Sequence, residues 1–183
     1  MKKIMMTLAA VLCCAMTTTV LTACGGSDDS GNVPGPDKTP VAGVMEAKFE
    51  VSEDIIKYLD VTVEYYDADG SVKKEQMDKT TWSKQVKAKL TAKLGARLSM
   101  KVKDGVDVST ITKMTFDVAD PYKLYCVDSS SSEVGAVKIG GASSSITITG
   151  NQLAELLKKR ENGVFSKFLY ILDGKTITST DWE

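Results

Sequence analysis

Hydrophobic and polar residues alternate almost without interruption from Trp82 to Val102. The apolar side chains fall on even positions, and lysine, arginine, serine and glutamine fall between them. Because successive side chains of a β-strand point to opposite faces, this period of two predicts a strand with one buried face and one wet face. A single straight strand of this length would span about 70 Å, too long for a small domain. We therefore expect a corner between Thr91 and Gly95, with Gly95 as the pivot.

Shorter runs elsewhere predict more strands, separated by glycine, proline, aspartate and serine. The expected strands are Val44–Val51, Leu59–Tyr65, Ser71–Met77, Thr110–Val118, Tyr122–Val127, Val134–Ile139, Ser145–Thr149, Phe165–Leu172 and Lys175–Thr180. Between two of them, Asp67–Gly70 has the composition of a hairpin turn. A calcium loop beginning at Asp67 is disfavoured, because Val72 and Asp78 stand where an EF-hand needs glycine and glutamate.

One helix is expected in the C-terminal half. Thr149 and Gln152 have the spacing of a capping box, a leucine stripe follows them, and Asn162–Gly163 ends the segment. Many short strands with one helix predict a mainly β fold, an antiparallel β-sandwich that is Ig-like in the broad sense, in preference to a closed barrel. We expect this domain to span residues 41–183.

The N-terminus has the pattern of an export signal. Lys2 and Lys3 precede an uncharged apolar run, Ile4–Met16, which is too short for a comfortable membrane crossing. Leu21-Thr22-Ala23-Cys24 follows and closely resembles the lipobox of bacterial lipoproteins. The resemblance implies a signal peptide over residues 1–23, cleavage before Cys24, and lipid on the Cys24 thiol. Acyl chains such as palmitate would anchor the protein, since each buried methylene contributes about 0.8 kcal/mol. The alternatives are an ordinary signal peptide with a chance cysteine, or an N-terminal membrane helix.

Residues 24–40 have the composition of a flexible tether, rich in glycine, serine, aspartate and proline. Within it, Ser27-Asp28-Asp29-Ser30 resembles an export tag of Bacteroidetes lipoproteins. The resemblance implies an outer-membrane lipoprotein, surface-exposed or else facing the periplasm. Lipobox, acidic tether and strand-rich body together resemble the small β-sandwich lipoproteins of Bacteroidetes.

The residue types that are missing limit the chemistry of the domain. The chain contains no histidine, which removes the commonest general base, the Ser-His and Cys-His pairs and the usual zinc ligand. Cys126 is the only cysteine after Cys24, so we expect no internal disulfide and a buried thiol. We expect no enzymatic activity, no cofactor and no metal. A net charge of −1 gives no indication of nucleic-acid binding.

The charges are unevenly distributed along the chain. Acids predominate from Ser27 to Asp69, and lysines predominate from Lys73 to Lys113. The favoured interpretation is that these charges pair across neighbouring strands. The other is a basic face for an anionic ligand, such as an acidic glycan or lipid headgroups. That candidate face would comprise Lys87, Lys89, Lys93, Arg97, Lys101 and Lys103.

Two hypotheses for the function follow. The first is a non-catalytic binding or structural module of the cell envelope, held to the membrane by its N-terminal lipid, with a polysaccharide or an envelope protein as partner. The second is a small carboxylate-dependent hydrolase or an apolar-ligand carrier. It requires two carboxylates about 5–10 Å apart in a concave pocket, or an apolar cavity. Trp82 and Tyr65 are expected in the core, and the role of Trp182 stays open.

Overall fold

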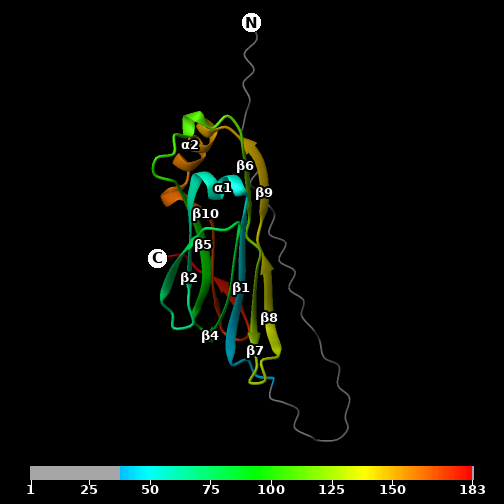
Figure 1. Cartoon of the computed structure of the whole chain (residues 1–183). Helices are drawn as coiled ribbons and strands as arrows, with labels where there is room; N and C mark the ends of the chain where they lie inside the picture. Colours follow the sequence, from blue (N-terminus) through cyan, green and yellow to red (C-terminus); the bar gives the residue numbers. More distant parts are fainter. Residues whose placement is uncertain (1–37, 183) are drawn as a thin grey trace, which may run out of the picture. The chain divides into compact units, whose positions relative to one another are not determined.

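A computed structural model describes residues 38–182, in which two antiparallel sheets pack face to face (Figure 1). The predicted signal peptide, Cys24 and most of the predicted tether lie outside the described residues. The strands are β1 (Ala42–Val51), β2 (Leu59–Tyr66), β3 (Val72–Met77), β4 (Thr81–Lys89), β5 (Lys93–Val102), β6 (Met114–Ala119), β7 (Tyr122–Val127), β8 (Glu133–Gly140), β9 (Ser143–Ile148), β10 (Val164–Leu172) and β11 (Ile177–Ser179). The helices are α1 (Glu53–Tyr58), α2 (Gly150–Lys158) and the 3₁₀ turns η1 (Val108–Thr110) and η2 (Glu161–Gly163).

The first sheet is built around β1. Strand β4 follows one side of β1 from the Ala42–Lys89 pair to the Glu50–Thr81 pair. Strands β7 and β6 follow the other side one after the other, and they pair in turn with β8 and β9. The chain from β6 to β9 is therefore one long hairpin, broken halfway at Asp120–Pro121 and at Gly141–Ala142.

The second sheet has the order β11-β10-β5-β2-β3. Its inward side chains and those of the first sheet form one core, in which Phe49 and Leu124 meet Val61 and Leu98. All four are inaccessible to solvent. Because the alternation in the sequence sets which side of each strand is apolar, the two faces of each sheet follow directly from it. The mainly β, antiparallel sandwich fold is confirmed.

The corner within the long alternating segment lies at the start of the predicted range, at Thr91. The chain leaves β4 and enters β5 through Leu90–Ala92, where Thr91 has a φ of 67° and donates its N–H to the Leu172 carbonyl at 2.7 Å. Gly95 lies inside β5, so its predicted role as the pivot was wrong. A Cβ there would stand 2.3 Å from the Phe168 carbonyl oxygen. The glycine is needed because β10 approaches β5 closely.

Helix α1 was not predicted, because its six residues are too few to show a helical period. It fills the core with Ile55, which is fully buried. The predicted capping box of α2 is present, with the Thr149 hydroxyl accepting from the Gln152 N–H and the Gln152 side chain accepting from the Thr149 N–H. Strand β6 begins at Met114 and not at Thr110, because the Asp107 side chain accepts from the Ser109 N–H and starts η1 there.

No helix in the described range is both long and apolar enough to cross a membrane. Cys126 is free and buried, as predicted, and burial raises the pKa of its thiol. Trp82 and Tyr65 also lie in the core, as predicted. Their ring centroids are 5.6 Å apart, and the ring centroid of Phe49 lies 5.6 Å from that of Trp82.

Candidate functional site

The six basic residues predicted to share a face divide between two surfaces. Lys87 and Lys89 are exposed on β4 of the first sheet, whereas Lys93, Arg97 and Lys101 lie on β5 of the second sheet. The physical reason is the corner at Thr91: the chain changes sheets there, so the odd positions before and after it point outward from opposite sides of the sandwich. A single face made of all six side chains is therefore not formed.

Several of these cations have partners within the domain. The Arg97 guanidinium forms an ion pair with Glu64 of the neighbouring strand β2, as the pairing interpretation expects. Lys101 lies 3.4 Å from Asp104. The Lys87 ammonium donates to the Ser131 hydroxyl at 3.2 Å. Lys103 donates to the Ile56 carbonyl of α1, where a cation stabilises the end of a helix.

Trp182 packs against the outer surface of the second sheet. Its ring centroid lies 5.1 Å from that of Tyr66, and the Arg97 guanidinium lies 4.7 Å from the Trp182 ring. These contacts cover Tyr66, which is the last residue of β2 and is only 7% exposed. Trp182 therefore covers Tyr66 and lies beside Arg97 on this surface.

The open side of the sandwich between β3 and β4 is closed by a polar cluster around Glu75. The carboxylate accepts from Trp82 Nε1 at 2.7 Å, from the Tyr65 hydroxyl at 2.7 Å and from Lys84 Nζ at 2.9 Å. These donors, Trp82 foremost, lower the pKa of Glu75 to about 2. Since β2 and β3 belong to the second sheet and β4 to the first, the cluster joins the two sheets.

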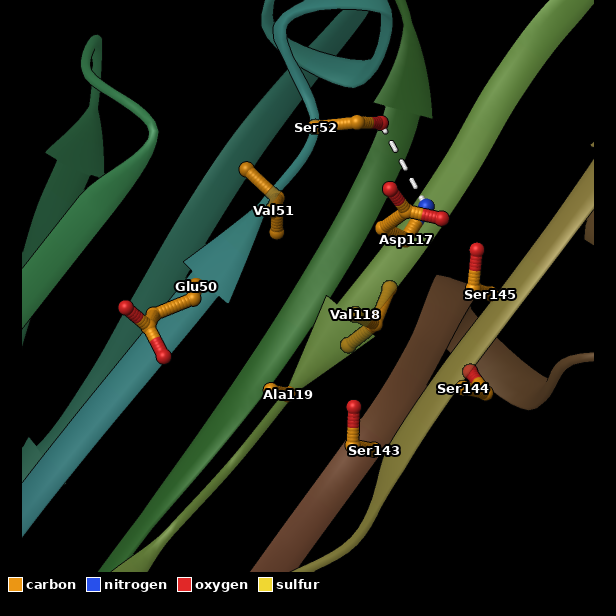
Figure 2. Close-up of a pocket in the computed structure, with 9 residues that line it drawn as sticks. All are labelled: Glu50, Val51, Ser52, Asp117, Val118, Ala119, Ser143, Ser144 and Ser145. Carbon is orange, nitrogen blue, oxygen red and sulfur yellow. Dashed lines mark hydrogen bonds between the residues drawn. The ribbon is translucent and has the colours of Figure 1, made fainter.

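An open depression lies on the outer face of the first sheet, where β1 ends beside β6 (Figure 2). Its volume is about 270 Å³, and a neighbouring depression of about 430 Å³ shares Glu50, Ala119 and Ser143 with it. The lining residues of the first are Glu50, Val51, Ser52, Asp117, Val118, Ala119, Ser143, Ser144 and Ser145. We call this the serine depression.

Strand register explains why the serine depression is hollow. Glu50 of β1 stands opposite Ala119 of β6, which stands opposite Ser143 of β9. Two residues further along β6 and β9, Asp117 stands opposite Ser145. Residues opposite one another on neighbouring strands share a face, so small side chains lie between and beside the two carboxylates. Figure 2 shows Asp117 flanked by Ser52 and Ser145, with Glu50 on the adjacent strand.

Residues beyond the end of β1 hold Asp117 in place. Ser52 donates its N–H to the Asp117 carbonyl at 3.1 Å, and its hydroxyl accepts from the Asp117 N–H at 3.4 Å. Asp54 then accepts from the Thr115 N–H at 2.7 Å. These two residues replace the partner strand that β6 loses where β1 stops, so the backbone under the serine depression is fixed.

The carboxylate of Asp117 is not compensated. Its Oδ1 is buried and has no hydrogen-bond partner within the described residues. Glu50, in contrast, forms an ion pair with Lys48 at 2.7 Å. A buried acceptor without a donor costs free energy, so Asp117 is the member of this site that would gain most from a cationic or hydrogen-bonding ligand.

The outer edge of β9 is open. Asp120 donates its N–H to the Ala142 carbonyl at 3.0 Å, which fixes Asp120–Ala142 as a hydrogen-bonded pair in the β6–β9 register. Bonded and non-bonded pairs alternate in an antiparallel ladder. The even residues of β9 therefore bond to β6, and Ser143, Ser145 and Thr147 turn their backbone N–H and C=O groups to the free edge. Strand β9 ends its sheet on this side.

No sequence pattern marked Glu50, Asp117 or β9 as part of a functional site, although a strand was predicted at Ser145–Thr149. The site depends on the register of β1, β6 and β9, which no local pattern reveals. One signal was available: between Val134 and Ala154 the chain has a single charged residue, Lys138. A long uncharged strand is unusual at a sheet edge, because charges and prolines ordinarily protect edges from unwanted pairing.

The described part of the chain contains no group of three or more histidine, cysteine, aspartate or glutamate side chains that could hold a metal ion. The serine depression offers carboxylates, hydroxyls and backbone groups, which suit a cationic or extended polypeptide ligand better than an apolar one. Comparisons with protein-family models, with curated proteins and with solved structures found no match to this chain.

Proposed function

We propose that the protein is a lipid-anchored, non-catalytic binding or structural module of the bacterial cell envelope. The observation that carries the proposal is the lipobox-like Leu21-Thr22-Ala23-Cys24 behind a charged head and a short apolar run. Lipid on Cys24 would hold the chain at the outer membrane, with the sandwich facing the surface or the periplasm.

The architecture of the domain supports this role. The chain enters the sandwich through β1, which is paired on both sides, with β4 along one and β7 and β6 along the other. An anchor attached ahead of Ala42 therefore leads into the most extensively bonded strand of the first sheet. Such an attachment suits a module that is held at a membrane while its surface engages a partner.

Metabolic labelling tests the anchor. The full precursor is expressed in a lipoprotein-processing bacterium that is fed an alkyne analogue of palmitate. We expect label on the protein and recovery in the membrane fraction, with both lost in Cys24→Ser. The matched control is Cys14→Ala, which also removes a cysteine but should retain label and fractionation. Absence of label on the unmodified protein, or unchanged membrane recovery of Cys24→Ser, would contradict the proposal.

One observation favours a second candidate, a carboxylate-dependent hydrolase: Glu50 and Asp117 line the same depression. The ion pair between Glu50 and Lys48 opposes it, because it occupies one of the two carboxylates. Hydrolysis of chromogenic glycosides by the protein, abolished in both Glu50→Gln and Asp117→Asn, would establish the hydrolase in place of the binding module.

A further inference from the structure

We propose that β9 is a strand-addition site, which binds an extended segment of another protein carrying lysine or arginine next to Ser145. The inference rests on the proposed function only in taking the partner from the cell envelope. Three independent features of the first sheet meet at this strand: an unpaired edge, a row of small side chains, and an uncompensated carboxylate.

The edge supplies the main-chain bonds. Ser143, Ser145 and Thr147 direct their backbone groups outward, and no described residue bonds to them there. An extended peptide could therefore pair along β9 and add one strand to the sheet, a common mode of peptide recognition. The devices that usually prevent such pairing are missing from β9, which contains no proline and no charge.

The small side chains supply a path for a long cationic side chain. A residue of the added strand next to Ser145 would lie two strand spacings, about 10 Å, from Asp117. Ser145 lies between them and fills little of that space, as the volume of the serine depression indicates. A lysine, with its flexible four-carbon stem, can lie along this trough and place its ammonium at the carboxylate.

Charge selects the kind of partner. Asp117 has no cationic partner among the described residues, and its Oδ1 lacks a donor. An added strand with lysine or arginine at this position would supply both. A second copy of the chain paired through the same edge would not, because β9 has no basic residue to offer. A partner strand with acidic residues would be repelled.

The test uses the mature chain, residues 24–183, with Cys24→Ser so that no lipid is attached. The described residues, 38–182, lie within one compact unit with its own core, so this chain is expected to fold. The probe is an acetylated seven-residue peptide that alternates lysine with valine, followed by NMR of the ¹⁵N-labelled protein. We expect saturable shifts centred on β9 and slower hydrogen exchange at Ser143, Ser145 and Thr147.

Two variants separate the contributions. Thr147→Pro removes a backbone N–H that faces the free edge and does not bond to β6. Because proline is tolerated at such an edge, the unfolding midpoint should stay close to that of the parent. Binding of the peptide should be lost. Asp117→Asn should weaken binding by about fivefold, the effect of one partly exposed ion pair. The matched control Asp104→Asn removes an exposed carboxylate from the turn that follows β5 and should leave peptide binding unchanged.

Several results would overturn the proposal: no binding of the lysine peptide, equal binding of the same peptide with glutamate for lysine, or binding unaffected by either variant. A dimer in sedimentation that disappears in Thr147→Pro would assign the edge to a second copy instead. None of these outcomes bears on lipid attachment at Cys24, so failure here and failure of the anchor can be told apart.

Discussion

Glu75→Gln should destabilise the domain strongly at neutral pH and weakly in acid. In the native state, three donors lower the pKa of the Glu75 carboxyl from 4.5 to about 2. A shift of this size corresponds to about 3 kcal/mol of stability for a fully shielded group. Since the side chain is 39% exposed, solvent screening reduces the expected contribution to about 1–2 kcal/mol.

The lowered pKa of Glu75 determines how the stability difference between the parent and Glu75→Gln changes with pH. A carboxyl whose pKa is lower in the folded state stabilises the protein above its unfolded pKa, and this stabilisation is lost as pH falls from about 5 to about 2. The glutamine variant never carries the charge. Its free energy of unfolding should therefore fall below that of the parent at pH 7, and the difference should shrink by pH 3.

Urea unfolding followed by tryptophan fluorescence measures this difference, because Trp82 donates directly to Glu75. The control is Glu161→Gln, an exposed carboxylate with no ion-pair partner described, which should behave like the parent at both pH values. An equal loss of stability by Glu75→Gln at pH 7 and at pH 3 would refute the reasoning, since the charge would then contribute nothing.

Two further predictions concern the core. Gly95→Ala should cost about 3 kcal/mol or more in urea unfolding, because its Cβ would stand 2.3 Å from the Phe168 carbonyl oxygen, which belongs to the backbone of a bonded strand and cannot easily move. Gly43→Ala is the matched comparison: its Cβ would meet only Leu94 and Leu172 side-chain atoms, the nearest at 3.2 Å, so equal losses for the two variants would contradict this account. Cys126 should react with a thiol reagent only as fast as the domain opens, because the thiol is buried and burial raises its pKa. Rapid labelling in native buffer that urea does not accelerate would contradict this prediction, since it would show that the thiol is accessible.

The parts of the fold that could be predicted from the sequence are those set by local burial. Strand β7 was predicted with its observed bounds, and the even positions from Trp82 to Val102 point mainly inward as expected. Local patterns failed where a residue adopts a backbone conformation that its residue type rarely adopts. Thr91 adopts a positive φ that glycine normally supplies, so the corner was placed at Gly95.

The surface features were harder to predict, because they depend on which strands become neighbours. The division of the lysines between two surfaces requires knowing that the chain changes sheets at Thr91. The serine depression requires the register of β1 against β6, whose paired residues lie far apart in the sequence. The sequence contained the uncharged strand β9, but only the topology shows that it ends a sheet.

The first sheet contains both β1, which follows the proposed lipid anchor, and β9, which is the proposed site for a partner strand. The chain leaves the predicted anchor and enters β1, β1 pairs with β6 at Glu50 and Val51, and β6 pairs with β9 along its length. A force applied by a partner strand on β9 would therefore reach the anchor through main-chain hydrogen bonds within one sheet. Strands β1 and β6 share two residue pairs, and β7, which continues from β6, shares six more with β1. Ser52 and Asp54 extend this route by bonding to β6 beyond the end of β1.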